Sequence, residues 1–407
     1  MKLWFVKWAI PLVRKESGMK DYVKIGIIGV GNIGSAHAAS IYGGKVEGMK
    51  LTALCDTDPN RLSALRALYP DVAVFDHAEE LMKSGLAEAV LIATPHYAHP
   101  PIAETAFSYG LHVLTEKPAG VYCSAVKKMM QAAEKSGKAF GVMFNQRTNT
   151  LFKRAKAIVS EGGLGELKRS VWIVTNWYRK QSYYDSGDWR ATWRGEGGGV
   201  LLNQAPHNLD IFTWICGMPS SVFALCDEGK YHHIEVEDDV TIILRYPNGA
   251  TGVFITSTGE YPGTNRLEMT GTKGKIVIEN GVLTHTKLGI DERDYCFSDD
   301  TVKNEIFTEI FHDEKYNGHI LILQNFARHI LYGDALVASG YEAIREITVS
   351  NAAYLSAWKG NEIRLPMDDA LFEEILFQKV QISGAERGKN SGEDIQFSYK
   401  DRWNTNW

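Results

Sequence analysis

The sequence predicts an α/β protein with an N-terminal, doubly wound parallel sheet and a C-terminal α+β domain built on a large, open, mostly antiparallel sheet. Three observations support this fold class. An apolar run near the amino end breaks into glycines with the spacing G-x-G-x-x-G. Strand-like and helix-like segments alternate up to about residue 145, which is typical of a parallel sheet. Beyond that point long extended segments and hairpin dipeptides predominate.

Length and composition limit the class of protein. A chain of 407 residues is too long for one core, and 44% hydrophobic with 23% charged residues is typical of a soluble globular protein. The net charge of −5 and the lack of a basic stripe argue against a nucleic-acid partner. The cysteines are odd in number and form no C-x-x-C pair, so we expect no disulfide framework, no metal site and a reducing, cytoplasmic compartment: Cys55, Cys123, Cys216, Cys226 and Cys296.

Four segments are expected along the chain. Residues 1–20 are interpreted as an N-terminal extension, because Lys7 and Pro11 interrupt an apolar stretch too short to be a signal peptide or a membrane span. A peripheral amphipathic anchor is the alternative. The remaining segments are an NAD-binding domain, an α+β substrate and oligomerisation domain and a polar C-terminal tail, at 21–145, 146–383 and 384–407.

In the first domain, apolar strand-like runs alternate with helical segments closed by glycine or started by proline. Strands are predicted at 24–28, 49–55, 72–75, 89–93, 112–114 and 139–144. Helices are predicted at 33–42, 59–69, 78–84, 100–109 and 124–136.

In the second domain, the dipeptides Asn248-Gly249 and Asn280-Gly281 predict hairpin turns in an antiparallel sheet. Extended segments are predicted at 166–176, 221–224, 240–246, 250–258, 267–271, 274–279, 282–286 and 362–366. Helices are predicted at 150–161, from near 203 to 216, at 318–332 and at 341–359.

The glycine pattern predicts a Rossmann dinucleotide site. Gly29 permits a tight turn, Gly31 leaves room for a pyrophosphate, and Gly34 allows the helix to pack closely on the sheet. Asn32 and Ile33 open that helix, whose first N–H groups attract phosphate. The alternative is an ordinary glycine-rich turn.

An acidic residue strengthens the case for a dinucleotide. Asp56 ends the second predicted strand, where a carboxylate can accept hydrogen bonds from the ribose hydroxyls. The same charge would repel a 2′-phosphate, which favours NAD over NADP. Asp58 is interpreted as the cap of the helix that begins at Pro59.

Glu116-Lys117-Pro118 follows a predicted parallel strand. Pro118 restricts Lys117 to an extended conformation, which would aim its side chain consistently toward the nicotinamide end of a cofactor. An ammonium group there could hold a substrate hydroxyl and exchange a proton with it. A solvated Glu–Lys pair on a surface turn is the alternative.

The second chemical motif is Gly197-Gly198-Gly199 followed by Asn203 and His207. On one continuous helix, residues 203 and 207 would share a face, with Asp210 three positions further on. The imidazole of His207 titrates near neutral pH and could take a hydroxyl proton as hydride leaves the carbon. A helix cap for Asn203 and a structural histidine are the alternatives.

The segment from 176 to 194 is rich in aromatic and hydrogen-bonding side chains, which suit the C–H faces and hydroxyls of a sugar or cyclitol. A protein interface is the alternative, because interfaces are also rich in aromatics and arginine. The candidate substrate contacts in this segment are Asn176, Trp177, Tyr178, Trp193 and Arg194.

Taken in order, these motifs resemble those of the glucose–fructose oxidoreductase, inositol dehydrogenase and rhizopine catabolism (Gfo/Idh/MocA) family, over about residues 22 to 370. The resemblance implies NAD(P)-dependent oxidation of a secondary hydroxyl and homodimers or homotetramers. It also implies Lys117 at the reacting hydroxyl and His207 as acid/base, with Gln146 and Arg147 near the nicotinamide and the substrate. Implied cofactor contacts are Thr94, Pro95, His99 and Glu116.

One residue departs from the family pattern, because many members carry aspartate where this chain has Asn203. A neutral amide cannot hold charge, so Lys117 and His207 would share the proton transfer. We expect an NAD-dependent dehydrogenase of a sugar, glycoside or cyclitol hydroxyl, with hydride passing to nicotinamide C4. The alternatives are a glycoside-cleaving enzyme that uses bound NAD for transient oxidation and elimination, and a non-catalytic sensor of NAD or sugar.

Overall fold

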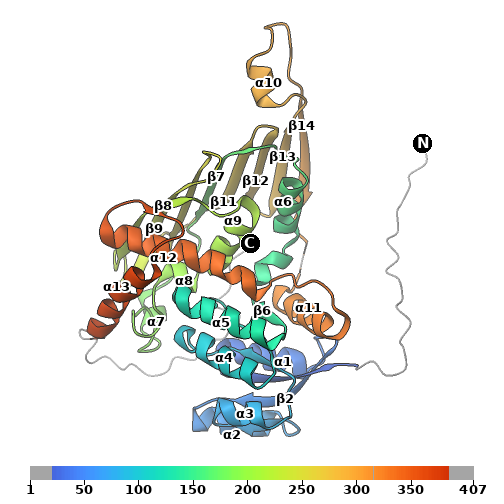
Figure 1. Cartoon of the computed structure of the whole chain (residues 1–407), viewed down its shortest axis with the longest axis vertical. Coiled ribbons are helices and arrows are strands. Elements are labelled where there is room, and N and C mark those ends of the chain that lie inside the picture. Colours follow the sequence, from blue (N-terminus) through green and yellow to red (C-terminus); the bar gives the residue numbers. More distant parts are fainter. Residues whose placement is uncertain (1–20, 315, 385–407) are drawn as a thin grey trace, which may run out of the picture.

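The structure, a computed structural model, describes residues 21–314 and 316–384. Its strands form two sheets: a parallel sheet at one end of the molecule and a larger, fan-like sheet toward the other (Figure 1). The predicted extension, and the predicted tail from residue 385 onward, lie outside the described residues.

The first sheet has six strands in the order β3-β2-β1-β4-β5-β6, and every pair is parallel. Strand β4 is buried along its whole length, as expected where helices cover both faces of a parallel sheet. The predicted doubly wound sheet is therefore confirmed. Its strands are β1 Val23–Ile28, β2 Met49–Cys55, β3 Ala73–Phe75, β4 Ala89–Ile92, β5 His112–Thr115 and β6 Phe140–Val142.

Helices connect these strands. They are α1 Asn32–Tyr42, α2 Pro59–Leu68, α3 Ala78–Lys83, α4 His99–Ser108 and α5 Cys123–Ser136, with the short 3₁₀ helix η1 His96–Ala98 before α4. A much later helix, α11 Gly318–Tyr332, also packs against β1 and β2 and against η2 Asn145–Thr148. The last third of the chain thus returns to the first sheet.

The second sheet has nine strands in the order β14-β13-β12-β11-β7-β10-β9-β8-β15. All its pairs are antiparallel except β7 with β10, so the expected mostly antiparallel sheet is confirmed. The strands are β7 Leu167–Val174, β8 Ser221–Glu228, β9 Glu237–Arg245, β10 Thr251–Ser257, β11 Asn265–Gly271, β12 Gly274–Glu279, β13 Val282–Leu288, β14 Ile306–His312 and β15 Ile363–Arg364.

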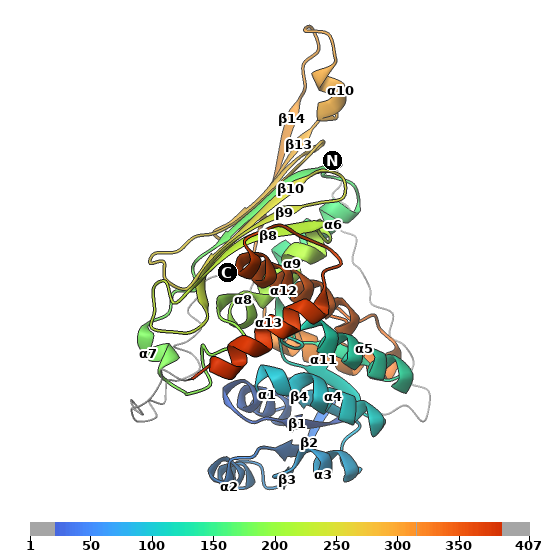
Figure 2. The ribbon, with the colours of Figure 1, turned by 60° about the vertical axis from the view of Figure 1, so that its left-hand side comes forward.

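One face of this sheet is covered by helices and the other is open (Figure 2). Strand β9 shows the alternation: Val240, Ile242 and Leu244 are buried, whereas Ile243 between them is exposed. The helices of the second part are α6 Thr150–Ser160, α8 Val200–Asn203, α9 Pro206–Cys216, α12 Ala343–Lys359 and α13 Asp369–Ile382. Among them, α6, α8, α9 and α12 contact strands of the sheet.

The asparagine–glycine turns have the expected positions. Asn280 and Gly281 join β12 to β13 with φ of 51° and 72°, the left-handed conformation that a two-residue hairpin turn requires. Gly249, between β9 and β10, has φ of 85°.

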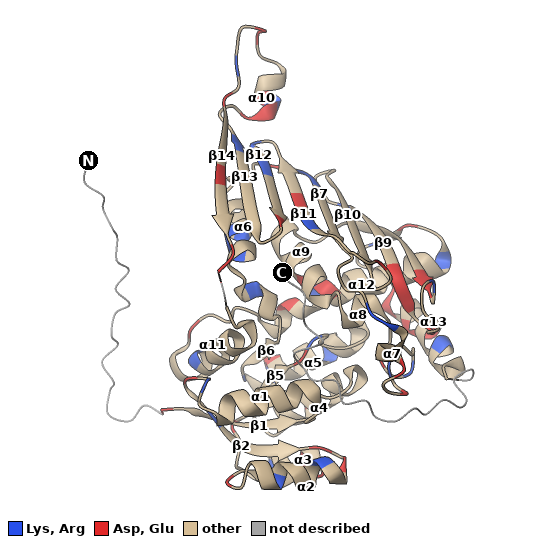
Figure 3. Ribbon diagram, turned by 180° about the vertical axis from the view of Figure 1, so that it is seen from behind, with Lys and Arg blue, Asp and Glu red and all other residues tan. Residues whose placement is uncertain are grey.

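Several elements were not predicted: α7 Gln181–Tyr184, α10 Glu292–Cys296, strand β14 and helix α13. The predicted helix at 341–359 begins with the short 3₁₀ helix η3 Gly340–Glu342 and continues as α12. Strand β14 lies at the sheet edge and is largely exposed, so its sequence lacks a buried alternation. Charged residues of both signs lie side by side on the outer strands (Figure 3). Lys287 on β13 and Glu309 on β14, for example, form an ion pair of 2.5 Å across the two strands.

Candidate active site

The glycine loop between β1 and α1 has the backbone that a phosphate cradle requires. Gly29 has φ of 88°, and a Cβ added there would lie 2.7 Å from the Ala93 backbone. A Cβ on Gly34 would lie 2.0 Å from the carbonyl oxygen of Gly29, whereas one on Gly31 would have no heavy atom within 4 Å. Larger side chains are therefore excluded at the turn, while the space above Gly31 is open.

Gly31 is also the N-terminal cap of α1, and no side chain in the described ranges 21–314 and 316–384 caps this helix end. The first helical residues, Asn32 and Ile33, therefore present backbone N–H groups at the positive end of the helix dipole. This arrangement fits the pyrophosphate of a dinucleotide.

Asp56 lies beside this loop, at the end of β2. Its carboxylate accepts a 2.7 Å hydrogen bond from the Val30 N–H and a 3.0 Å bond from the Asp58 N–H. The guanidinium group of Arg61 lies 3.5 Å away. Asp58 caps α2 through the N–H groups of residues 60 and 61, so that part of the prediction is confirmed.

The loop after β4 supplies a buried hydroxyl. Oγ1 of Thr94 is buried and has no hydrogen-bond partner among the residues that the structure describes. His99 lies between two carbonyl oxygens, with Nε2 2.7 Å from Thr94 O and Nδ1 2.8 Å from Pro118 O. His99 thus ties the loop after β4, which includes Pro95, to the loop after β5.

Glu116 is held by a histidine from the glycine-loop helix. Its carboxylate lies 2.7 Å from Nε2 of His37, whose ring packs at 5.6 Å from the ring of His319 on α11. Burial alone would raise the pKa of Glu116, but the hydrogen bond and the charges of His37, His319 and Lys117 lower it to about 2. Glu116 is therefore a buried carboxylate that anchors α1, through His37, at this edge of the sheet.

Lys117 reaches the second part of the chain. Its ammonium group donates a 2.7 Å hydrogen bond to the carbonyl oxygen of Asn203 at the end of α8. Burial lowers the pKa of Lys117, while the carboxylates of Glu116, Glu196 and Glu346 raise it. An ammonium group has three donors, so two remain for other oxygen atoms.

His207 lies in the first turn of α9 and is buried. Its Nδ1 has no hydrogen-bond partner within the described ranges, and its ring meets that of Phe144 at 6.3 Å. Burial, followed by the charges of Lys117 and His319, lowers its pKa well below 6.5. The imidazole is therefore neutral at neutral pH and can accept a proton.

The expected continuous helix from residue 203 to 216 is wrong. The structure has two helices, α8 ending at Asn203 and α9 beginning at Pro206. Proline has no N–H to donate and restricts the residue before it, so the first helix cannot continue through this point. Asn203 and His207 consequently do not share one helical face.

Comparison with known proteins identifies the family. Residues 23–144 match the family model described as oxidoreductase family, NAD-binding Rossmann fold, and residues 152–277 match the GFO/IDH/MocA C-terminal domain. The chain belongs to the Gfo/Idh/MocA family. It is therefore an oxidoreductase with an NAD-binding Rossmann fold, as the motifs predicted.

Relatives within the Gfo/Idh/MocA family include the myo-inositol 2-dehydrogenase of Thermotoga maritima, 24% identical over 84% of this chain and 98% of that protein. The inositol 2-dehydrogenase of Rhizobium meliloti is 25% identical over 63% and 76% of the two chains. The WlbA dehydrogenase of Bordetella pertussis, solved with NADH and UDP-GlcNAcA, superposes with a TM-score of 0.71 at 26% identity, covering 85% of this chain and all of that one.

Several residues that the resemblance to the Gfo/Idh/MocA family placed near the substrate have other contacts. Arg147 is buried and forms a bidentate ion pair with Asp210 at 2.6 and 2.8 Å, and it also contacts Glu342. Its donors are thus used inside the protein. Gln146 is also buried, and its Oε1 accepts a 3.0 Å hydrogen bond from Tyr316.

The predicted aromatic segment divides between core and surface. Trp177 and Trp193 are buried, and Nε1 of Trp193 donates to the carbonyl oxygen of Glu235. Tyr178 is 40% exposed and packs against Tyr261, 5.3 Å away between ring centroids. Asn176 is half-buried and Arg194 is exposed. The structure therefore gives the two tryptophans packing roles, because their rings fill the core.

Sequence reasoning missed Glu196, which precedes the three glycines. It is buried, accepts a 2.6 Å hydrogen bond from the Ala191 N–H and contacts the side-chain amide of Asn203. The neutral amide that departs from the family pattern is thus bonded to a carboxylate. A charged residue directly before Gly197-Gly198-Gly199 was the only signal for it in the sequence.

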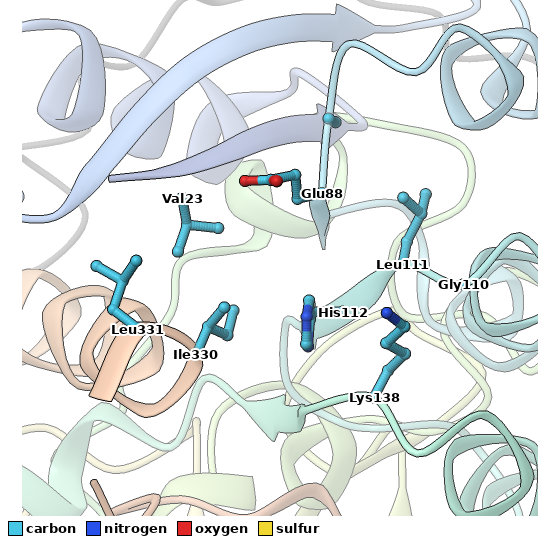
Figure 4. A pocket seen from close by; sticks show the side chains of 9 residues that line it. Val23, Glu88, Gly110, Leu111, His112, Lys138, Ile330 and Leu331 are labelled. Atoms are coloured by element: carbon cyan, nitrogen blue, oxygen red, sulfur yellow. The ribbon is translucent and has the colours of Figure 1, made fainter. Parts of the chain in front are cut away.

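One cavity lies away from these residues. It has a volume of about 510 Å³ and opens at the amino ends of β1, β4 and β5, the sheet edge opposite Lys117 (Figure 4). Ligands of open α/β sheets bind at the carboxyl ends of the strands, so this cavity is not the candidate active site. Its lining includes Val23, Glu88, Leu111, His112, Lys138 and Leu331.

Within 21–314 and 316–384, no group of three or more His, Cys, Asp or Glu side chains could hold a metal ion. None of the helices in that part of the chain is long and apolar enough to cross a membrane.

Proposed function

We propose that this chain is an NAD-dependent dehydrogenase that oxidises a secondary hydroxyl of a sugar, glycoside or cyclitol. The observation that carries the proposal is the hydrogen bond from Lys117 to the carbonyl oxygen of Asn203, which brings the lysine to the segment that carries His207. The two residues are 90 positions apart in sequence, and the charge of Lys117 lowers the pKa of His207. An ammonium donor and a neutral imidazole beside the carboxyl end of a Rossmann sheet are the groups that alcohol oxidation requires.

The glycine loop fits the dinucleotide, as the open space above Gly31 and the uncapped start of α1 indicate. Asp56 would accept hydrogen bonds from the ribose hydroxyls, and its negative charge favours NAD over NADP. When bound, NAD supplies the hydride acceptor.

The residues of the chain would hold and deprotonate the hydroxyl. The two remaining N–H donors of Lys117 would bind the hydroxyl oxygen and stabilise negative charge on it. His207, held neutral by burial, would take the hydroxyl proton as the hydride leaves the same carbon. The relatives named inositol dehydrogenases and the sugar nucleotide in the WlbA structure support a polyol substrate.

The test is NADH formation, followed at 340 nm, across a panel of sugars, glycosides and cyclitols, with NADP in parallel. Turnover with NAD that depends on Lys117 supports the proposal. Release of an aglycone without NADH accumulation would support the elimination reaction instead, and tight NAD binding without turnover would support a sensor.

We also propose that the protein is a cytoplasmic homodimer or homotetramer. The open sheet face carries exposed apolar side chains, among them Leu225 and Ile243, which suit contact with a second copy. All five cysteines are free, in keeping with a reducing cytoplasm. Light scattering of wild type and Ile243→Asp tests the homodimer or homotetramer.

A further inference from the structure

Glu196 occupies an unusual position for a carboxylate. Its side chain is 2% exposed and forms a long ion pair of 3.9 Å with Arg190, while the closer contacts are the Ala191 N–H and the amide of Asn203. Such burial is costly unless the charge has a partner. Burial accordingly raises the pKa of Glu196, while the Ala191 N–H, Arg190, Asn203 and Lys117 lower it.

Asn203 links this carboxylate to Lys117. Its backbone carbonyl oxygen accepts the hydrogen bond from the ammonium group, and its side-chain amide donates to Glu196. Lys117 and Glu196 therefore bind the backbone and the side chain of one residue, which is the last residue of α8.

We propose that Glu196 is a positioning residue: it fixes Asn203 through the amide and supplies the buried negative charge that keeps the Lys117 ammonium group in place. The catalytic meaning of this role rests on the proposed dehydrogenase function. The link between the two charges does not, and it can be measured without a substrate.

Other charged groups also face Lys117. Glu116 and Glu346 raise the pKa of Lys117, and Arg179 lowers it. The charge of Lys117 in turn lowers the pKa of four histidines: His96, His99, His207 and His319. Glu116 is bonded to His37, and Glu346 accepts a hydrogen bond from Ser350. Of the three carboxylates, Glu196 is the one bonded to the residue that receives the lysine hydrogen bond.

Two variants test this inference: one removes the negative charge, and the other restores it at the adjacent residue. Glu196→Gln removes the charge and keeps the shape, because the Gln oxygen can still accept from the Ala191 N–H and Asn203 can flip its amide. Glu196→Gln/Asn203→Asp restores one negative charge at the adjacent position, with the Gln amide now donating to the Asp carboxylate. Glu235→Gln is the matched control, since Glu235 contacts Ser383 and Gly384 instead of Asn203.

The readout is the pKa of Lys117, titrated by NMR after reductive ¹³C-methylation of the full-length protein and assigned by its absence in Lys117→Arg. We expect the pKa to fall by about 1 unit in Glu196→Gln, because a nearby opposite charge has been removed. It should return toward the wild-type value in the double variant and stay unchanged in Glu235→Gln. An unchanged pKa in Glu196→Gln, or no recovery in the double variant, overturns the inference.

The pH profile of kcat should show its lysine-dependent limb moving in the same direction. If the wild type forms no NADH with any substrate, the proposed function fails, while the NMR titration still tests the charge link. If Glu196→Gln does not fold, Glu196→Gln/Asn203→Ser serves as the uncharged counterpart of the double variant, and equal Lys117 pKa values in the two overturn the inference.

Discussion

The ammonium group of Lys117, after β5, donates a 2.7 Å hydrogen bond to the carbonyl oxygen of Asn203, at the end of α8. The bond joins the parallel sheet to the segment that carries His207. Because it engages one of three donors, the lysine is oriented and still able to bind another oxygen atom.

Replacing Lys117 by Met should therefore abolish most of the activity while the protein remains folded. The methionine keeps the length of the side chain but neither binds the hydroxyl oxygen nor carries charge, so kcat should fall ~10²–10⁴-fold. NADH formation measures the loss, and NADH fluorescence titration should show nearly unchanged cofactor affinity. Lys128→Ala, on the exposed face of α5, is the control. Wild-type turnover in Lys117→Met would exclude the proposed role.

His207→Gln should lower kcat by a comparable ~10²–10⁴-fold, because the neutral proton acceptor is lost. Burial and the charges of Lys117 and His319 place the pKa of His207 well below 6.5, so the wild type should show no acid limb in kcat near pH 6.5. A pH profile from 5 to 9 checks this. A limb at pH 6.5 that disappears in His207→Gln would contradict the neutral, buried imidazole.

Asp56→Ala should weaken NAD binding and reduce the preference over NADP. The substitution removes the carboxylate that would bind the ribose and repel a 2′-phosphate, and a ~10-fold or greater loss of NAD affinity corresponds to at least ~1.4 kcal/mol. Titration with NADH and NADPH measures both effects. Asp58→Ala removes the cap of α2 and should lower stability by ~1 kcal/mol without changing the cofactor ratio. An unchanged ratio in Asp56→Ala would refute the assignment.

Arg147 should prove structural. Arg147→Ala leaves Asp210 buried without its bidentate partner, so the free energy of unfolding should fall by ~3–5 kcal/mol. Arg147→Met/Asp210→Leu, which removes both charges, should recover much of that loss. Urea unfolding measures the stabilities. Should Arg147→Ala raise KM for the substrate at unchanged stability, the residue would instead be a substrate contact.

The protein should lose stability as the pH falls below about 6.5. Burial, followed by neighbouring positive charges, lowers the pKa of His96 to about 3 and that of His319 to about 4. Because the unfolded chain then binds more protons than the native one in this range, protonation favours unfolding. In His96→Asn, which keeps a donor for the Glu196 carbonyl oxygen, the loss of unfolding free energy between pH 7 and 4.5 should shrink by ~2 kcal/mol. Equal slopes in urea titrations would contradict this.

Most of the first sheet could be predicted from sequence because its strands are short, buried apolar runs separated by helices with clear starts and ends. The cap of α2 by Asp58 and the turn at Asn280-Gly281 could also be predicted, because each depends on residues adjacent in the sequence. Helix α13 had a signal that was overlooked, since Asp368 caps it and Phe372 and Leu376 repeat at helical spacing. Strand β14 had none, because edge strands need no buried face.

By itself, the sequence determined the order of the strands and helices, the glycine loop, Asp56, Lys117 and His207, because each depends on residues close together in the chain. Only the tertiary structure decided how these groups meet. It broke the helix between Asn203 and His207, turned Arg147 toward Asp210, and brought Glu196 and His319 to the neighbourhood of Lys117 from other elements. Those contacts arise from packing between distant segments, which local sequence patterns do not encode.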